Sequence, residues 1–270
     1  MLLLGLVGIA GCGEHDSSGE VVAVRIDQLK VGEGDDLPAV VANPPGGPTP
    51  YETPSDVPSY EPEELDRTEL DAYLAALPRA DRALVDHYLR APLGEGSWVM
   101  AAPMTVEEAK ARLLGPNPEP ASRRDVPSAT SSSYVFLQVG DGVVAYEDTG
   151  FADPPGRLLA ALSRDGGAAA VATENIEAMT RFGYARDGKV VFDAFEYAFV
   201  EDLEEIPAEV RDLARLAWVD LDGPFVETAD WFAVAMAMSE KVTGVRAAPA
   251  VQDVTDAYVV PLPWAGTSDG

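Results

Sequence analysis

The sequence predicts an α+β fold: a largely antiparallel sheet with two Asp-Gly hairpins, helices packed on one face, and two C-terminal helices. The first observation is a pair of Asp-Gly dipeptides, at 141–142 and 187–188, each between two runs rich in β-branched and aromatic residues. This dipeptide suits the tight turns that join antiparallel strands. The second observation is that strands follow one another without a regular alternation with helices. That order favours antiparallel pairing over a parallel sheet.

The composition excludes two broad classes of protein. The 270 residues are 47% hydrophobic and 8% aromatic, so the chain has enough apolar material for a core and is not wholly disordered. There are 46 acidic and 19 basic side chains, and the formal net charge is −27. Nucleic-acid binding draws its affinity from Lys and Arg at phosphates. No nucleic-acid partner is therefore expected.

The chain opens with an uncharged apolar run, residues 1–10, followed by Gly11 and Cys12. The run is too short to span a bilayer and small residues follow it, as in a secretory signal. Ile9-Ala10-Gly11-Cys12 resembles the lipobox of bacterial lipoproteins. The resemblance implies that residues 1–12 are a lipoprotein signal ending at a lipidated Cys12, which would hold the protein on the extracytoplasmic face of the cell membrane.

Two further observations bear on this N-terminal prediction. The apolar run carries no Lys or Arg at its start, where a secretory signal normally has one, so a buried N-terminal helix is the alternative. Cys12 is the single cysteine, which excludes an intramolecular disulfide and a cysteine zinc site.

Residues 13–64 are expected to form an extended tether. The segment is acidic and rich in Pro and Gly, most densely at 43–50, and such composition describes a self-repelling linker. The Val-rich segment 20–26 inside it is the one stretch with the pattern of a short strand.

Residues 65–92 are expected to form a pair of helices. Apolar residues recur at helical spacing from 70 to 77 and again from 84 to 89. Pro78 lies between these two sets, where it suits the first turn of the second helix. His87 falls beside the second apolar stripe, and we expect it to be a surface or partly buried residue, not a ligand.

An α+β domain is expected over residues 97–250, followed by a C-terminal tail over 251–270. Its first half begins with a strand and a short helix, because Thr105-Val106-Glu107-Glu108 is a capping box and Gly115-Pro116 ends the helix. A loop rich in Pro and Ser precedes the first hairpin, and another helix follows it. The expected ranges are 98–102 for the strand, 105–114 for the helix, 116–133 for the loop, 134–139 and 143–147 for the hairpin, and 155–164 for the next helix.

The second half of the domain is expected to add three strands. Residues 168–173 form an apolar run of strand length. The second hairpin pairs 179–185 with 190–195 around Asp187-Gly188, whose residue types suit a type I′ turn.

Two helices are expected to close the fold. Apolar residues recur at helical spacing over 206–217 and again over 231–242. Asp230 or Thr228 can cap the last helix, and Gly244 can end it.

Several segments between Trp98 and Pro249 carry a second resemblance, namely 105–109, 146–151, 175–188, 195–196 and 240–245. Together they are similar to an uncharacterised family of actinobacterial proteins that is classed only as a domain of unknown function. The resemblance implies one compact domain and brings no activity. In that family the segment beginning at Asn175 is closer to Asn-Val-Asn-Ala-x-Ser-Arg-Phe-Ser-Tyr, and here Glu177 replaces the second Asn and Gly183 the second Ser.

Any catalysis must use carboxylates, hydroxyls, Lys or Arg, and the carboxylates are the best candidates. Beyond His87 the chain contains no His and no Cys, which removes the usual general base, metal ligand and thiolate nucleophile. Glu147 and Asp148 end the first hairpin, and Asp193 and Glu196 lie near the end of the second. Paired carboxylates can divide acid and base roles. Solvated strand ends are the favoured explanation in a chain with 46 acidic residues, so no catalytic residue is assigned.

The second polar cluster lies along the second predicted hairpin. Arg181 can clamp a carboxylate or a phosphate in a fork of hydrogen bonds. The favoured alternative is an ion pair with Glu147, Glu174 or Glu196 on a neighbouring strand. No cation-binding spacing such as Asp-x-Asp-x-Asp-Gly occurs, so neither a metal nor a cofactor is expected. The residues that can contribute to a ligand site are then Glu147, Asp148, Asn175, Arg181, Tyr184, Asp193 and Glu196.

Three functions remain open from the sequence. The leading one is a membrane-anchored extracytoplasmic lipoprotein whose domain binds a ligand or a protein without catalysis. The second is a hydrolase that acts on an envelope polymer through its carboxylates. The third is an immunity-like protein whose acidic surface binds a basic toxin, since opposite charge steers such an encounter.

Overall fold

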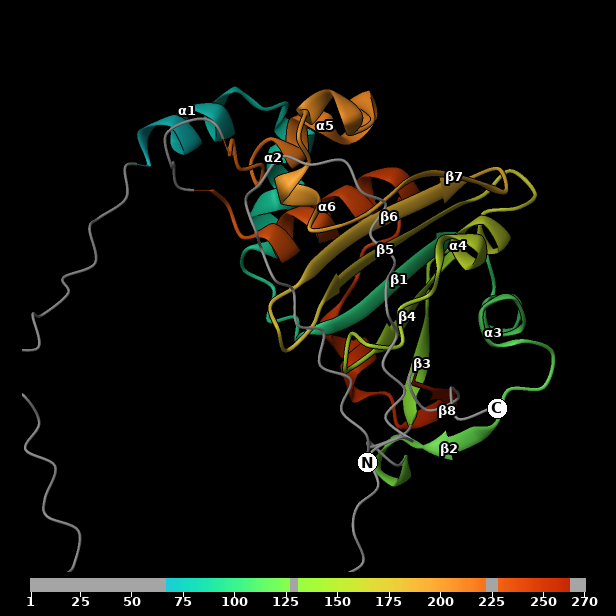
Figure 1. Ribbon diagram of the computed structural model, residues 1–270. Helices are drawn as coiled ribbons and strands as arrows, with labels where there is room; N and C mark the ends of the chain where they lie inside the picture. Colours follow the sequence, from blue (N-terminus) through green and yellow to red (C-terminus); the bar gives the residue numbers. More distant parts are fainter. Residues whose placement is uncertain (1–66, 127–130, 222–227, 263–270) are drawn as a thin grey trace, which may run out of the picture. The chain divides into compact units, whose positions relative to one another are not determined.

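A single antiparallel sheet organises the computed structural model, which describes residues 67–126, 131–221 and 228–262 (Figure 1). Its strands are β1 (Gly96–Ala102), β2 (Pro120–Ser122), β3 (Ser131–Val139), β4 (Gly142–Glu147), β5 (Ala168–Glu174), β6 (Thr180–Arg186), β7 (Lys189–Phe195) and β8 (Asp256–Pro261). Their order in the sheet is β2-β8-β3-β4-β1-β5-β6-β7, and every neighbouring pair is antiparallel. The predicted α+β class with a largely antiparallel sheet is confirmed.

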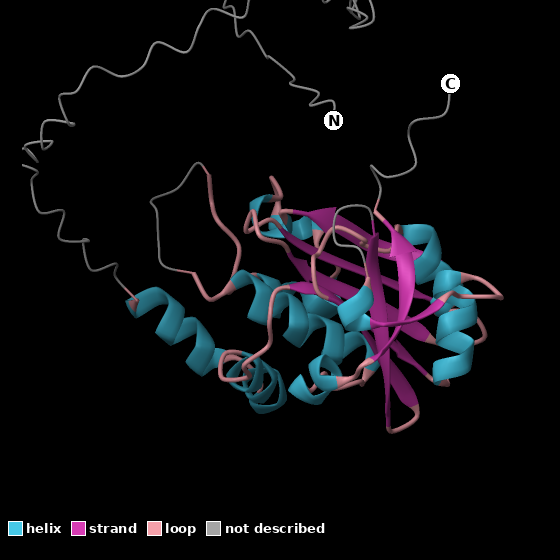
Figure 2. Ribbon diagram, turned by 90° about the horizontal axis from the view of Figure 1, so that it is seen from below, coloured by secondary structure: helices cyan, strands magenta, loops and turns pink. Residues whose placement is uncertain are grey.

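Helices cover both faces of this sheet (Figures 1 and 2). Trp98 and Met100 of β1 point into a core shared with α2, α5 and α6, whereas Val99 and Ala101 point into a second core shared with α3 and α4. This corrects the expectation of helices on one face. The helices are α1 (Thr68–Ala76), α2 (Arg79–Tyr88), α3 (Val106–Leu114), α4 (Gly156–Leu162), α5 (Ala208–Ala214) and α6 (Trp231–Thr243), with 3₁₀ turns η2 (Arg123–Asp125), η3 (Tyr197–Phe199), η4 (Leu203–Glu205) and η5 (Pro249–Asp253).

The central strands explain why both faces are covered. In β1 and β5 every residue from 97 to 101 and from 169 to 173 is buried, so neither strand alternates between a buried and a solvated face. Antiparallel strands with one solvated face alternate apolar and polar residues. The continuous apolar runs in the sequence therefore indicate strands sandwiched between two helical layers.

The helix termini follow their capping residues. The Thr105 hydroxyl accepts from the Glu108 backbone N–H, and the Glu108 carboxylate accepts from the Thr105 N–H, as the capping box predicts. Asp230 caps α6 by accepting from the Ala233 N–H at 2.6 Å. Gly244 ends α6 with φ of 72°, a conformation that glycine adopts without strain.

The two hairpin turns differ in how their Asp-Gly residues are used. In the β6–β7 turn Asp187 and Gly188 have φ of 51° and 75°, and Arg186 pairs with Lys189, as in a type I′ turn. In the β3–β4 turn Gly140 has φ of 61°, and Gly142 already belongs to β4.

The C-terminal segment extends the sheet and is not a tail. β8 pairs with β3 on one side and with β2 on the other, so residues assigned to the tail 251–270 and to the loop 116–133 both form strands. No turn motif in the sequence marks the pairing of β8 with β2 or with β3, because these strands are far apart in the chain. The predicted signal at 1–12 and tether at 13–64, with its strand at 20–26, lie outside the described residues.

Within the described ranges, no helix has the length and apolar character needed to cross a membrane.

Candidate functional site

A row of polar side chains crosses one end of the sheet. Glu147 of β4 lies opposite Ser97 of β1, Ser97 opposite Thr173 of β5, and Thr173 opposite Arg181 of β6. All four are no more than 2% exposed. Side chains of residues directly opposite each other lie on one face of a sheet, here the face that α3 and α4 cover. Four neighbouring strands therefore place two buried charges and two hydroxyls side by side.

Asp153, in the loop between β4 and α4, closes over this row. Its carboxylate accepts hydrogen bonds from the hydroxyls of Ser97 and Thr173 and lies 3.3 Å from Nη1 of Arg181. Burial raises the pKa of Asp153 above its ordinary value of 3.8, although Arg181 and the two hydroxyls oppose this effect. The loop is thus fastened to three strands through one carboxylate.

Arg181 holds a second carboxylate in a two-pronged contact. Nε donates to Oδ1 of Asp193 at 2.8 Å and Nη2 to Oδ2 at 3.0 Å, while Nη1 donates to the Pro154 carbonyl at 3.0 Å. A Cβ on Gly183 would lie 2.7 Å from Oδ1 of Asp193, so glycine at this position makes room for the pair. The predicted ion pair of Arg181 exists, but its partners are Asp153 and Asp193, not Glu147, Glu174 or Glu196.

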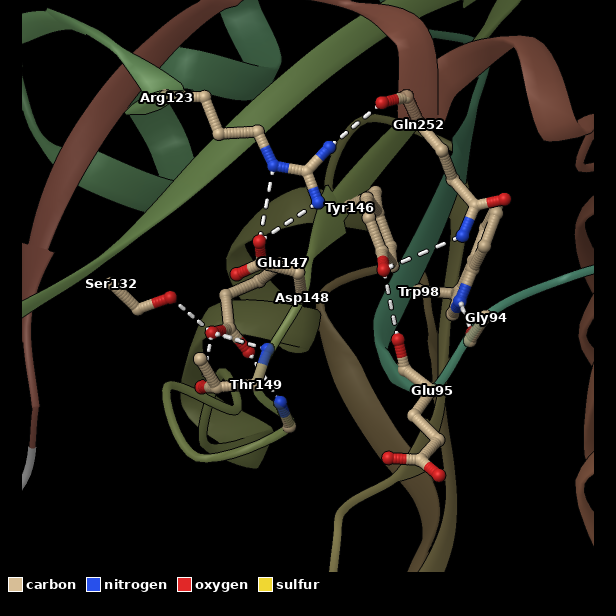
Figure 3. A network of polar contacts seen from close by, with 11 residues as sticks. Gly94, Glu95, Trp98, Arg123, Ser132, Tyr146, Glu147, Asp148, Thr149 and Gln252 are labelled. Carbon is tan, nitrogen blue, oxygen red and sulfur yellow. Dashed lines mark hydrogen bonds and ion pairs between the residues drawn. The ribbon is translucent and has the colours of Figure 1, made fainter. Parts of the chain in front are cut away.

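Glu147 is buried in a socket of hydrogen-bond donors (Figure 3). Its carboxylate accepts from the backbone N–H groups of Thr149 at 3.0 Å and Gly150 at 2.8 Å, and from the hydroxyls of Ser132 and Thr149. Gly150 has φ of 68°, and a Cβ there would lie 2.9 Å from Cβ of Asn175. The socket fixes the start of the loop that carries Asp153.

Asp148 points away from Glu147 and belongs to a separate network (Figure 3). It forms an ion pair of 2.8 Å with Arg123, and Arg123 also donates to the Gln252 carbonyl at 2.8 Å. The Arg123 guanidinium lies 5.1 Å from the centre of the Tyr146 ring. These contacts join η2, β4 and η5, and they separate the two carboxylates that the sequence places side by side.

The remaining polar residues shape the tip of the β5–β6 hairpin. Oδ1 of Asn175 accepts from the N–H groups of Glu177 at 3.0 Å and Met179 at 3.1 Å. Oε1 of Glu196 accepts from the Thr180 N–H at 3.0 Å, and this closes the adjacent end of β7. These three side-chain bonds add to the backbone bonds from Asn175 to Met179 and from Glu196 to Thr180 where the strands end.

This scaffold presents apolar side chains to solvent. Ile176 is 74% exposed, Met179 39% and Phe195 57%. We call these three residues the hairpin-tip patch. The Arg181 guanidinium lies 5.1 Å from the centre of the Phe195 ring, so the buried ion pairs directly support one member of the patch.

The structure sorts the predicted ligand-site residues into three places. The hairpin tip is surrounded by Asn175, Arg181, Asp193 and Glu196. Glu147 lies further along the polar row to which Arg181 belongs. Asp148 belongs to the Arg123 network, and Tyr184 lies on the opposite face of the sheet. There its hydroxyl donates to Glu209 at 2.5 Å.

Sequence reasoning missed Asp153, Ser97 and Thr173. Ser97 and Thr173 interrupt otherwise apolar strands, and this was the available signal for a buried polar row. Asp153 lies in a loop, after Gly150 and directly before Pro154 and Pro155. No sequence pattern in such a loop indicates which side chains its carboxylate contacts.

The four carboxylates considered for catalysis do not share partners in the structure. Different protein partners hold each of Glu147, Asp148, Asp193 and Glu196. In the part of the chain that the structure describes, no group of three or more His, Cys, Asp or Glu side chains can hold a metal ion.

The socket of Glu147 predicts a pH dependence of stability. Burial raises the pKa of Glu147 above its ordinary 4.5, because desolvation outweighs its hydrogen bonds. At pH values between the pKa of Glu147 in the unfolded chain and its higher pKa in the folded protein, the folded state binds more protons than the unfolded chain. The contribution of Glu147 to stability is therefore lost as pH rises through the folded pKa. We expect the difference in unfolding free energy between wild type and Glu147→Gln to grow as pH falls through this window. Urea unfolding at a series of pH values measures it, and a constant or shrinking difference would contradict the assignment.

Comparison with known proteins gives one match. A model described as "Family of unknown function (DUF6461)" matches residues 101–258. No curated protein matches the chain, and no solved structure does.

Proposed function

The chain belongs to a family of unknown function, DUF6461, and from this premise we propose that it is a membrane-anchored extracytoplasmic lipoprotein whose α+β domain binds another protein without catalysing a reaction. The observation that carries the binding role is the hairpin-tip patch. Its apolar side chains are exposed, yet the residues beneath them are fixed by buried ion pairs and hydrogen bonds. Exposed apolar groups gathered on a rigid support are typical of protein-binding surfaces.

The free edge of the sheet limits how a partner can bind. β7 is the last strand of the sheet, and its pairing with β6 shifts register so that Val191 is an extra residue. A bulge and a charged residue such as Lys189 both hinder the addition of a further strand. A partner is therefore expected to contact the side chains at the Phe195 end and not to extend the sheet.

The chemistry of the tip indicates the kind of partner. Glu177 is exposed between Ile176 and Met179, and the whole chain carries a net charge of −27. A partner with an apolar centre and a basic rim complements such a surface. An immunity-like role toward a basic toxin is the specific form of this proposal that the net charge favours.

The anchor is tested by detergent partitioning. The full chain expressed in the producing cells is expected in the detergent phase, because a lipidated Cys12 carries acyl chains that the aqueous phase excludes. Cys12→Ser is expected to move the protein to the aqueous phase, while Ser18→Ala, a small change a few residues later, leaves it unchanged. Equal partitioning of wild type and Cys12→Ser would exclude the lipid anchor.

The binding role is tested by photo-crosslinking from the hairpin-tip patch in intact cells. A specific protein adduct supports the proposal, and the absence of any adduct contradicts it.

A further inference from the structure

A pocket of about 210 Å³ opens on the α6 face of the sheet, and none of the three hairpin-tip residues lines it. It lies between the end of α2, the end of β5 and the beginning of α6. The volume exceeds the ~150 Å³ of an engineered cavity that takes benzene and is below the ~300 Å³ at which drug-sized pockets begin. The pocket therefore has room for a ligand of a few carbon atoms with one polar group.

Most of the residues that line the pocket are apolar, but polar atoms provide the larger part of its exposed surface. Leu89, which is 46% exposed, forms part of its rim, and Phe232 and Met236 of α6 form buried parts of its lining. The ring of Tyr88 also lines it, while the Tyr88 hydroxyl donates to Glu240 at 2.8 Å and accepts from the Ala247 N–H. Because that hydroxyl already donates one hydrogen bond and accepts another, Tyr88 contributes mainly its ring to the pocket.

One carboxylate in the lining lacks a counter-charge. The Glu174 side chain forms no hydrogen bond or ion pair with any described residue, and burial raises its pKa, with further contributions from the charges of Asp230 and Glu95. No basic group opposes this effect. Asp230 also lines the pocket, but its Oδ1 is occupied by the Ala233 N–H at the start of α6. A ligand that brings a positive charge to Glu174 would relieve this repulsion.

We propose that this pocket binds a small organic ammonium ion, whose apolar body packs against Leu89 and Phe232 and whose ammonium group donates hydrogen bonds to Glu174. An anion would be repelled by Glu174 and Asp230, and a neutral ligand would leave Glu174 unpaired. A bare metal ion would find too few oxygen ligands among the described residues. The same chemistry can come from a free amine or from a lysine side chain of a polypeptide.

Titration with n-hexylammonium tests the proposal. The protein is the full chain carrying Cys12→Ser, so that no lipid competes for the amine, and binding is followed by calorimetry and by chemical shifts. We expect saturable binding of n-hexylammonium and at least tenfold weaker binding of 1-hexanol, which has the same apolar body without the charge. Absence of saturable binding, or equal binding of the alcohol, would overturn the proposal.

Variants locate the site. Glu174→Gln is expected to weaken the binding of n-hexylammonium at least tenfold. Glu177→Gln, which removes one charge from the nearby hairpin tip, is expected to leave this binding unchanged. Ala233→Leu is expected to block binding by filling the pocket, and its thermal unfolding confirms that it folds. Equal weakening by both Gln variants would mean non-specific attraction to an acidic protein and would refute the site.

A third ligand distinguishes the two sources of the ammonium group, a free amine and a lysine side chain. If Nα-acetyl-lysine methylamide binds more tightly than n-hexylammonium, the natural ligand is a lysine side chain, and weaker binding indicates a free amine. Both results support the pocket. Phe195→Ser in the hairpin-tip patch is expected to leave all three titrations unchanged, so failure of this inference and failure of the protein-binding proposal are distinguishable.

Discussion

Replacing Arg181 with methionine is expected to lower the free energy of unfolding by about 3–5 kcal/mol, the usual cost of removing one partner from a buried ion pair. Methionine fills similar space without charge, so Asp153 and Asp193 both lose the group that neutralises them. The loss is large because the side chains of Arg181 and Asp153 are only 3% and 11% exposed, so water cannot replace the missing guanidinium.

Arg186→Met is the matched control for this prediction. It lies on the same strand and forms an ion pair of 2.9 Å with Glu209, but the two side chains are 42% and 37% exposed. An exposed pair contributes only about 0–1 kcal/mol. Urea unfolding of both variants measures the difference, and an Arg181→Met cost no greater than that of Arg186→Met would show that the polar row does not stabilise the fold.

Loss of partner binding is the second large effect, and it is expected from Ile176→Ser combined with Phe195→Ser. These side chains are 74% and 57% exposed, so the double variant is expected to fold with a change of roughly 0.5 kcal/mol per site or less. Apolar and aromatic anchors at the centre of an interface cost about 2 kcal/mol or more when truncated. The complex should therefore weaken by at least about 30-fold, as measured by the yield of complex recovered with the tagged chain.

Val190→Ser combined with Val191→Ser is the control for the tip variant. Both residues lie on the same strand and are 43% and 45% exposed, but they are at the bulged end beside Lys189. This control is expected to keep its partner. Equal losses in the two double variants would mean that general surface hydrophobicity, and not the hairpin-tip patch, holds the complex.

Local signals in the sequence were sufficient for most helices and both hairpins. The apolar spacing from 70 to 89 predicted α1 and α2, and the Thr105 box and the Asp230 cap predicted where α3 and α6 begin. These features depend on residues within a few positions of one another. The strand β8 could not be found in this way, because it is defined by pairing with β3, more than a hundred residues earlier.

The candidate site was predicted only in part, for the same physical reason. Arg181 was recognised as a residue that needs an acidic partner, but its partners depend on strand register and on the path of a loop. Gly183 leaves space for Asp193, and Asp153 reaches Arg181 only because the Glu147 socket fixes the start of its loop. Neither relation can be read from spacing in one strand.

A photo-crosslinking amino acid at position 195, in intact cells that produce the protein, shows whether the hairpin-tip patch binds another protein. We expect one adduct of defined mass after irradiation. We expect none from position 107 on α3, where the side chain is 82% exposed but lies outside the patch. If position 195 gives no adduct, or an adduct of twice the chain's own mass, or the same adduct as position 107, the patch does not bind another protein.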